Sequence, residues 1–348
     1  MVNTLLIMGA AKFSLLGPLY TLFGWITRFF YQFTGNYGIA IILLTILIRG
    51  LLIPLNVSSQ KSMIKMQALS GKTAELQRKY GNDKQKYNEE LMKLQQENGA
   101  GGFAGCILPF LQLIFIWPIW RIVSGPLCYV AQVGSSNIDK MVKIGDKMGV
   151  LKNARTITET SHIGLIEALN NNSEFLRKCL SEKLINMDQL FDFHFLGMDL
   201  TMTPSWNPIT IFKDPKTYVP LLIFPILVVA TQILAMKLTT WLKPGYKEQK
   251  EAKERAKNNP ARAGQVQEDQ AEQMMKTMNI VLPIFMLFTT FTLPAAMGLY
   301  WVVGGIMGLL TQVIVYYMFT KPYEAKKAEM AVKKANAFKK SGDGNNKK

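Results

Sequence analysis

The stretch that decides the fold is Ile41-Ile42-Leu43-Leu44-Thr45-Ile46-Leu47-Ile48-Arg49-Gly50-Leu51-Leu52-Ile53-Pro54-Leu55, an apolar run that contains one charged residue, Arg49. A helix through this run carries a guanidinium near mid-membrane. This costs about 2.5–3.5 kcal/mol on insertion scales, and arginine keeps its proton there. No acidic residue in another apolar run offers a counter-ion, so Arg49 needs water, backbone carbonyls or an incoming acidic partner. The alternative is a side chain that snorkels to the cytoplasmic headgroups.

Long stretches without charge occur at Phe29–Ile48, Asn98–Trp120, Thr217–Met236 and Thr277–Thr320. A spanning helix needs about 20 predominantly apolar residues. The last stretch has 44 residues, which make roughly 66 Å of helix, about twice the bilayer core. It must therefore form two helices, with the turn at Pro294-Ala295-Ala296-Met297-Gly298. The sequence predicts an all-α polytopic membrane protein with five transmembrane helices, at residues 36–58, 100–125, 217–240, 277–294 and 297–320.

The distribution of charge predicts how these helices are oriented. Basic residues outnumber acidic ones by three in Ser59–Gly102, by three in Lys237–Lys276 and by six in Lys321–Lys348, whereas they balance in Pro126–Lys216. The positive-inside rule places the three basic segments in the cytoplasm and the balanced one outside. The N-terminus is then outside and the C-terminus cytoplasmic, which is the alternation that five spans require.

The segments between the spans have distinct compositions. Residues 1–35 are apolar, with only Lys12 and Arg28 charged, and predict an extracytoplasmic interfacial amphipathic helix; a sixth span is the alternative. Residues 126–216 form a long extracytoplasmic insert, and residues 241–276 form a cytoplasmic connector. Residues 321–348 form a basic cytoplasmic tail that either contacts anionic lipid or ribosomal RNA or is simply solvated and disordered.

Residues 59–99 are polar, rich in Lys, Glu and Gln, and free of proline. Apolar residues recur at helical spacing on both sides of Gly81-Asn82-Asp83, which predicts a cytoplasmic helical hairpin with its turn there. These residues are Met63, Met66, Leu69, Tyr87, Leu91 and Leu94. They either pack on each other or receive a client.

No catalytic or nucleotide-binding motif is present in the sequence, so we expect neither an enzyme nor a cofactor. His162 and His194 lack partners at metal-ligand spacing, and a disulfide between Cys128 and Cys179 has weak support. Polar residues inside the predicted spans are the candidate site: Arg49, Gln112, Gln232, Thr289, Thr290 and Gln312. They suit a hydrated pocket for a polar group in transit, or each simply hydrogen-bonds between helices.

Several motifs, in this order, resemble the YidC/Oxa1/Alb3 family of bacterial membrane protein insertases, of the Gram-positive type without a large periplasmic domain. The resembling stretches begin at Leu47-Ile48-Arg49-Gly50, Gln60-Lys61-Ser62-Met63, Gly105-Cys106-Ile107-Leu108-Pro109, Phe195-Leu196-Gly197-Met198 and Pro294-Ala295-Ala296-Met297-Gly298. The insert at Val130–Asp192 is far longer than the loop usual in that family.

The resemblance implies five helices around a hydrophilic groove that is closed on the outer side, with Arg49, Gln232 and Trp301 at groove-lining positions. It implies an insertase and chaperone that receives new membrane proteins at the plasma membrane, and leaves open a role for the ribosome or the Sec translocon as partners. A small-solute transporter or channel is the rival hypothesis, but it would need intramembrane carboxylates or repeats. A membrane-anchored scaffold that binds a ribosome or another partner is the second rival, and it leaves Arg49 unexplained.

Overall fold

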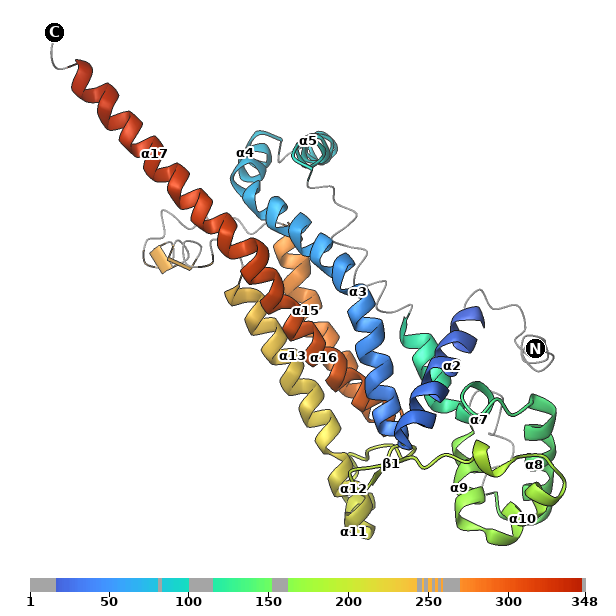
Figure 1. The fold of residues 1–348 in the computed structure, drawn as a ribbon. Helices are drawn as coiled ribbons and strands as arrows, with labels where there is room; N and C mark the ends of the chain where they lie inside the picture. The colour runs from blue at the N-terminus through green and yellow to red at the C-terminus, as the bar shows by residue number, and fades with distance from the viewer. Residues whose placement is uncertain are drawn as a thin grey trace. The chain divides into compact units, whose positions relative to one another are not determined.

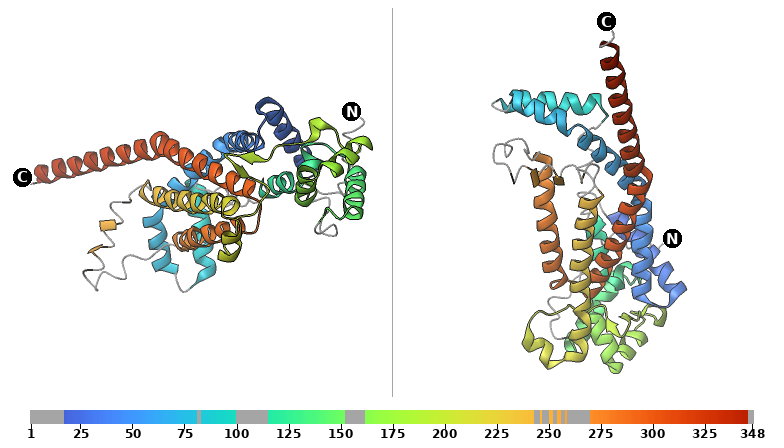
Figure 2. Two further views of the ribbon diagram at one scale, coloured as in Figure 1. Left: turned by 90° about the horizontal axis from the view of Figure 1, so that it is seen from below. Right: turned by 90° about the vertical axis from the view of Figure 1, so that its left-hand side faces the viewer.

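The computed structural model describes residues 17–80, 83–99, 115–151, 162–242 and 270–345, together with a few isolated residues between 246 and 258. Figures 1 and 2 show the described helices, and the chain divides into two compact units. The first unit comprises Met1–Gly50, Phe110–Ala230 and Ile284–Gly305, and the second comprises Leu51–Pro109, Thr231–Pro283 and Ile306–Lys348. Each unit is described by itself.

Helices dominate the described residues, and three of them are long and apolar enough to cross a membrane. These are Tyr37–Ser59 within α3 (Tyr37–Ala68), Pro215–Trp241 across α12 (Pro215–Leu221) and α13 (Ile223–Trp241), and Ala295–Lys333, which starts with α16 (Ala295–Val315). Of the five predicted spans, these correspond to the first, third and fifth.

The other two predicted spans are less completely described. The fourth corresponds to a shorter apolar stretch, Ile280–Thr290, in α15 (Gln270–Thr290). The second predicted span lies largely outside the described residues. Its described part, residues 115–124, is helical. The described residues therefore form a mainly helical chain with three helices able to cross a membrane, while the number five remains a prediction.

The first unit begins with α2 (Gly17–Thr34), whose buried side is held against α7 (Pro126–Tyr129). The approach is so close that a Cβ at Gly24 would overlap the carbonyl of Tyr129. The Arg28 guanidinium donates to the Ala131 carbonyl oxygen at 3.0 Å and pairs with Asp188 at 3.4 Å. Helix α2 is thus fixed to the insert by backbone packing and by one arginine.

The long insert contains a small helical core. Helices α8 (Ser135–Lys147), α9 (Ile163–Asn171) and α10 (Ser173–Ser181) contact one another, followed by a short 3₁₀ turn η2 (Met187–Gln189). Their buried faces meet through Met141, Leu165, Phe175 and Cys179. Cys128 and Cys179 are both buried, and no disulfide joins them.

A two-stranded antiparallel hairpin, β1 (His194–Phe195) and β2 (Met198–Asp199), follows the helical core. Leu196 and Gly197 both have positive φ angles, of 52° and 76°, which match a two-residue turn between the strands. The chain then forms α11 (Pro208–Lys213) and α12, and α12 contacts β2. The hairpin thereby connects the insert to the start of the α13 span.

The turn between α15 and α16 lies a few residues earlier than the sequence suggested. Helix α15 ends at Thr290 and α16 begins at Ala295, so the turn is Phe291–Pro294, and Gly298 lies inside α16. The reason is packing: a Cβ at Gly298 would lie 2.8 Å from Cβ of Phe224 on α13. This glycine permits a close helix contact and does not form the turn.

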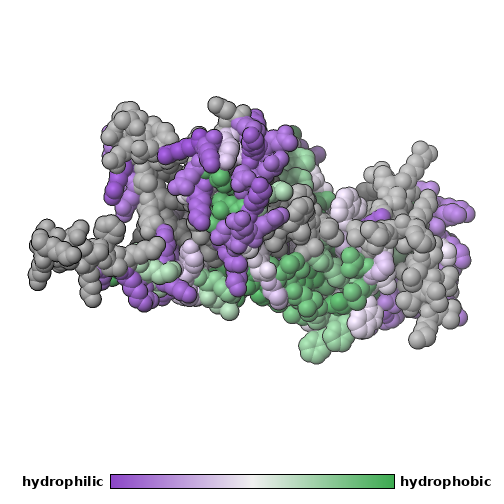
Figure 3. Space-filling view, turned by 90° about the horizontal axis from the view of Figure 1, so that it is seen from above, coloured by the Kyte–Doolittle hydropathy of each residue, from purple (hydrophilic) through white to green (hydrophobic). Residues whose placement is uncertain are grey.

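In the second unit, α4 (Ser70–Tyr80) and α5 (Lys84–Glu97) contact each other in the segment predicted as a helical hairpin. Beyond α16, a π-helical segment η4 (Tyr316–Thr320) leads into α17 (Lys321–Asn345). The basic tail is therefore helical up to Asn345, in place of the disordered alternative. Figure 3 shows a hydrophilic patch and a hydrophobic patch on the face that it draws.

Candidate functional site

Arg49 is partly buried on α3 and lies against one face of α16. A Cβ built on Gly304 would sit 2.8 Å from Nη2 of Arg49, 3.1 Å from its Nε and 3.3 Å from its Cζ. Any side chain at position 304 would occupy the space that the guanidinium now fills. Gly304 therefore lets a charged, planar group rest directly on the backbone of α16.

Tyr300 lies one helical turn before Gly304 and is almost completely buried. It forms a side-chain hydrogen bond with Arg49. The guanidinium has only donors, so the tyrosine hydroxyl oxygen accepts this bond. One turn of α16 thus provides both the space for the arginine and a neutral acceptor.

No carboxylate pairs with Arg49 within the part of the chain that the structure describes. A hydroxyl satisfies one of the five guanidinium N–H groups and leaves the positive charge uncompensated. Arginine cannot shed that charge by losing a proton. The site is therefore suited to a visiting anion or polar segment, because the protein itself supplies no counter-charge in the described residues.

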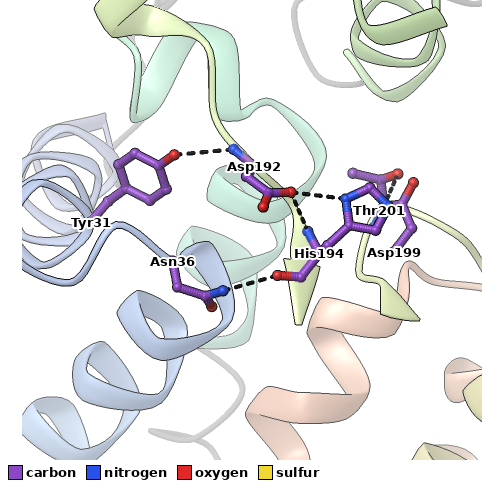
Figure 4. A network of polar contacts seen from close by, with 6 residues as sticks. All are labelled: Tyr31, Asn36, Asp192, His194, Asp199 and Thr201. Carbon is purple, nitrogen blue, oxygen red and sulfur yellow. Dashed lines mark hydrogen bonds and ion pairs between the residues drawn. The ribbon is translucent and has the colours of Figure 1, made fainter. Parts of the chain in front are cut away.

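The β1–β2 hairpin joins the first residues of α3 to the first residues of α16. At α3, the Asn36 amide donates to the His194 carbonyl oxygen at 3.0 Å (Figure 4). A Cβ at Gly38 would meet the Phe195 ring. At α16, the backbone N–H groups of Ala295 and Ala296 donate to the carbonyl oxygens of Met202 and Leu200, at 2.8 and 3.0 Å. The hairpin caps α16, whose first N–H groups have no partner inside the helix.

Aromatic packing fills the space behind this hairpin. The Tyr37 and Phe193 ring centroids are 4.7 Å apart, and those of Tyr31 and Phe191 are 4.4 Å apart. We call this arrangement of Asn36–Gly38, Phe191–Met202 and Ala295–Ala296 the end clamp. Arg49 follows Gly38 by eleven residues, or roughly 16 Å along a helix, so the end clamp and the arginine lie at different depths.

Polar contacts order the strand entering the clamp, as Figure 4 shows. The Asp192 backbone N–H donates to the Tyr31 hydroxyl at 3.1 Å, and the Asp192 carboxylate accepts from the His194 backbone N–H at 2.9 Å. Nδ1 of His194 lies 2.8 Å from the same oxygen. The backbone N–H of His194 holds the pKa of Asp192 below its usual value, with a smaller contribution from the ring.

The other predicted site residues of the first unit lie on α15 and α16. The hydroxyls of Thr289 and Thr290 donate to carbonyl oxygens of their own helix, Thr290 to Met286 at 2.6 Å, so their donor groups are used within α15. Trp301 is buried and follows Tyr300 directly, and its indole N–H has no hydrogen-bond partner among the described residues. An unpaired buried donor is costly, which makes Trp301 notable next to the arginine-bearing turn.

The remaining predicted site residues belong to the second unit or lie outside the described residues. Gln232 and Gln312 are partly buried, and the Oε1 atom of Gln312 accepts no hydrogen bond from the described residues. Gln112 lies outside the described residues. The structure therefore joins Arg49 with α16 but does not test the association of Arg49 with these glutamines.

The hairpin residues proposed to receive a client are described only in part. Leu69 is buried, while Tyr87, Leu91 and Leu94 are half-buried on α5. The side chains of Met63 and Met66 lie outside the described residues. Half-burial is what mutual packing of α4 and α5 produces, and it leaves part of each side chain on α5 exposed.

The candidate site predicted from the sequence did not include two residues that contact Arg49: Gly304, and Tyr300 as its acceptor. A signal for the first was present, since Gly304 and Gly308 form a Gly-x-x-x-Gly pattern in an apolar helix, which is typical of close helix approach. Nothing in the sequence indicated that the approaching group would be an arginine from a helix about 250 residues away.

Comparison with known proteins gives one family. The model of the family described as "60Kd inner membrane protein" matches residues 29–322. A protein from Caldanaerobacter subterraneus subsp. tengcongensis, named "Membrane protein insertase YidC", is 41% identical over 100 residues, covering 29% of this chain and 48% of that protein. A protein of the same name from Shewanella sp. strain W3-18-1 is 40% identical over 101 residues, covering 29% of this chain and 19% of that protein. The matches thus span about half of the first relative and about a fifth of the second.

Proposed function

The chain belongs to the 60Kd inner membrane protein family, the family of the YidC/Oxa1/Alb3 insertases, and from this premise we propose that it is a membrane protein insertase and chaperone. In this proposal it takes a hydrophilic segment of a client into a positively charged intramembrane groove. It then releases the client's transmembrane helix into lipid. The supporting observation is Arg49, held on α16 by Gly304 and Tyr300 without a carboxylate partner among the described residues.

The proposed mechanism follows from the free energy of moving a polar segment through lipid. A carboxylate or a peptide group without partners loses several kcal/mol when it leaves water. A fixed guanidinium offsets part of this cost, because opposite charges attract more strongly where water is scarce. The segment therefore waits at half depth near Arg49, and burial of the client's apolar helix in lipid drives the remaining movement.

The end clamp supports a one-sided path. It ties the first turns of α3 and α16 together through Phe195, Leu200 and Met202, with aromatic rings behind them. A client then enters from the end of the helices away from the clamp. We propose that this entry is cytoplasmic and that the clamp lies on the outer side, as the distribution of basic residues predicts.

The partners follow from this path. Clients are newly made membrane proteins, whose apolar helices the lipid bilayer receives. The α4–α5 pair is the proposed reception surface, and α17 carries lysines suited to ribosomal RNA or anionic lipid. The groove itself, with Gln112, Gln232, Thr289, Thr290, Trp301 and Gln312 along it, is part of the proposal.

The test uses purified protein in liposomes and a single-span client with an acidic outer tail. Arg49→Lys keeps the charge and should retain insertion, whereas Arg49→Ala should reduce it about tenfold or more, equivalent to about 1.4 kcal/mol. A client whose tail acids are replaced by Asn and Gln serves as the control and should insert almost equally with all three proteins. Normal insertion of the acidic client by a folded Arg49→Ala protein would exclude the charge as the working group.

A further inference from the structure

A second membrane-facing surface lies on the short helix α11, outside the residues of the proposed groove. Three large apolar side chains on and just before this helix are strongly exposed: Trp206 at 78%, Ile209 at 67% and Phe212 at 82%. Ile209 and Phe212 lie three residues apart on α11 and so occupy neighbouring positions on its surface, while Trp206 lies just before the N-cap residue Asn207. Exposed apolar patches of this kind mark a surface that another phase or partner covers.

The patch is held in place by helix caps and is not a loose loop. The Asn207 side chain accepts from the Ile209 backbone N–H at 3.0 Å, and Pro208 occupies the first turn of α11. The Asp214 side chain accepts from Thr217 N–H at 3.3 Å and caps α12 in the same way. Since α11 contacts α12 and α12 contacts β2, the exposed side chains have a fixed position relative to the end clamp.

The patch continues into the apolar face of a span. Val219 on α12 and Ile223 and Ile226 on α13 are exposed large hydrophobic residues of the segment Pro215–Trp241. In a membrane that face is covered by lipid tails, because nothing else of similar polarity surrounds a span. The neighbouring surface of α11 therefore lies where the lipid tails end and the headgroups begin.

The polar residues beside the patch fit the same boundary. Lys213 and Lys216 are exposed at the corner between α11 and α12, next to Phe212. Lysines there extend toward lipid phosphates, and tryptophan favours the interface between lipid tails and water. Figure 1 shows α11 and α12 at the end of α13 that also adjoins the hairpin.

We propose that Trp206, Ile209 and Phe212 form a lipid anchor, which inserts into the interface of the leaflet at the clamp end of α13. Its ligand is the phospholipid surface, with acyl chains for the three apolar side chains and phosphates for Lys213 and Lys216. The anchor holds the clamp end of the first unit at a constant depth. It involves none of the residues proposed for the client path, so its test is independent of the proposed insertase function.

The test measures depth in the membrane with a fluorescent thiol label on the full chain. Ile209→Cys carries the label in the patch, and Met187→Cys, at a residue with 68% exposure on η2, is the matched control. Wild-type protein treated in parallel gives the background from the three native cysteines, of which Cys128 and Cys179 are buried. Each protein is placed in phosphatidylglycerol–phosphatidylcholine nanodiscs at one copy per disc, with nitroxides on the acyl chains or with iodide in the water.

The proposal expects strong quenching of the Ile209 label by shallow acyl-chain nitroxides and several-fold weaker quenching by iodide than at Met187. Replacing both Trp206 and Phe212 by Ser should increase quenching of the Ile209 label by iodide and decrease its quenching by the nitroxides. Equal iodide quenching at both positions would overturn the lipid anchor. Protection of the Ile209 label from iodide that appears only when two copies share a disc would also overturn the lipid anchor, because the patch would then be an interface between copies of the chain.

Discussion

Gly304→Ala tests whether the glycine serves to hold Arg49 in place. The new Cβ would lie 2.8 Å from Nη2 and 3.1 Å from Nε of Arg49, closer than ordinary carbon–nitrogen contacts. The obstructing atoms are the end of a flexible side chain, so the guanidinium moves aside and the helix packing stays. The hydrogen bond to Tyr300 is lost, which costs roughly 1.5–3 kcal/mol for a bond to a charged group.

The stability of the protein should change little. Alanine in a helix interior is favoured over glycine by about 0.5–1 kcal/mol, which offsets part of the lost hydrogen bond. Insertion should nevertheless fall about three- to tenfold, because a displaced charge meets the client at the wrong place. The assay is insertion of the acidic-tailed client in liposomes, together with thermal unfolding in detergent.

The chain provides a matched control one turn further along α16. A Cβ at Gly308 has nothing within 4 Å, so Gly308→Ala should leave insertion unchanged and slightly raise stability. In an Arg49→Ala background, Gly304→Ala should have no further effect, since there is no guanidinium to displace. A loss of insertion of the same size in that background would refute the reasoning, and so would unchanged insertion in the wild-type background.

Three further predictions concern other parts of the first unit. Burial lowers the pKa of His162 to about 4 from an ordinary 6.5, so the unfolded state binds more protons in that interval; stability should fall by about 3 kcal/mol at most as pH drops from 6.5 to 4. Hydrogen exchange of α8–α10 measured against pH checks this, and His162→Leu should flatten the dependence. Gly38→Ala forces a Cβ against the Phe195 ring, so it should destabilise the end clamp by about 1–3 kcal/mol and speed exchange at the start of α3. Unchanged exchange there would contradict the close contact. Trp301→Phe removes a buried donor without a partner among the described residues, which offsets part of the packing lost with the smaller ring. Thermal stability should therefore change by less than about 1 kcal/mol while insertion falls, and unchanged insertion would contradict a role for Trp301 in the client path.

The sequence predicted the parts of the fold that depend on local composition. Apolar runs identified α3, α13 and α16, and the position of Arg49 in such a run identified the residue on which the proposed function rests. Hydrophobic periodicity also located the α4–α5 segment. These features follow from residues close together in the chain, where spacing alone carries the information.

Features that depend on distant partners could not be predicted in this way. The contact of Arg49 with Gly304 joins helices far apart in the sequence, and either side alone looks like an ordinary span residue. Gly298 resembled a turn residue but packs against Phe224, which moves the turn to Phe291–Pro294. The sequence predicted the long insert as one segment, because its apolar residues are divided among three packing partners. The structure shows that it contains a helical core, the clamp hairpin and α11.

A charge-reversal experiment tests most directly the central claim that Arg49 meets acidic groups of the client. Arg49→Glu is combined with two single-span clients that differ only in whether their outer tails carry aspartates or lysines, in liposomes without an imposed membrane potential. The account predicts that Arg49→Glu stops insertion of the aspartate client and restores insertion of the lysine client above the wild-type level. Equal effects of Arg49→Glu on both clients, in a protein that remains folded, would contradict the account.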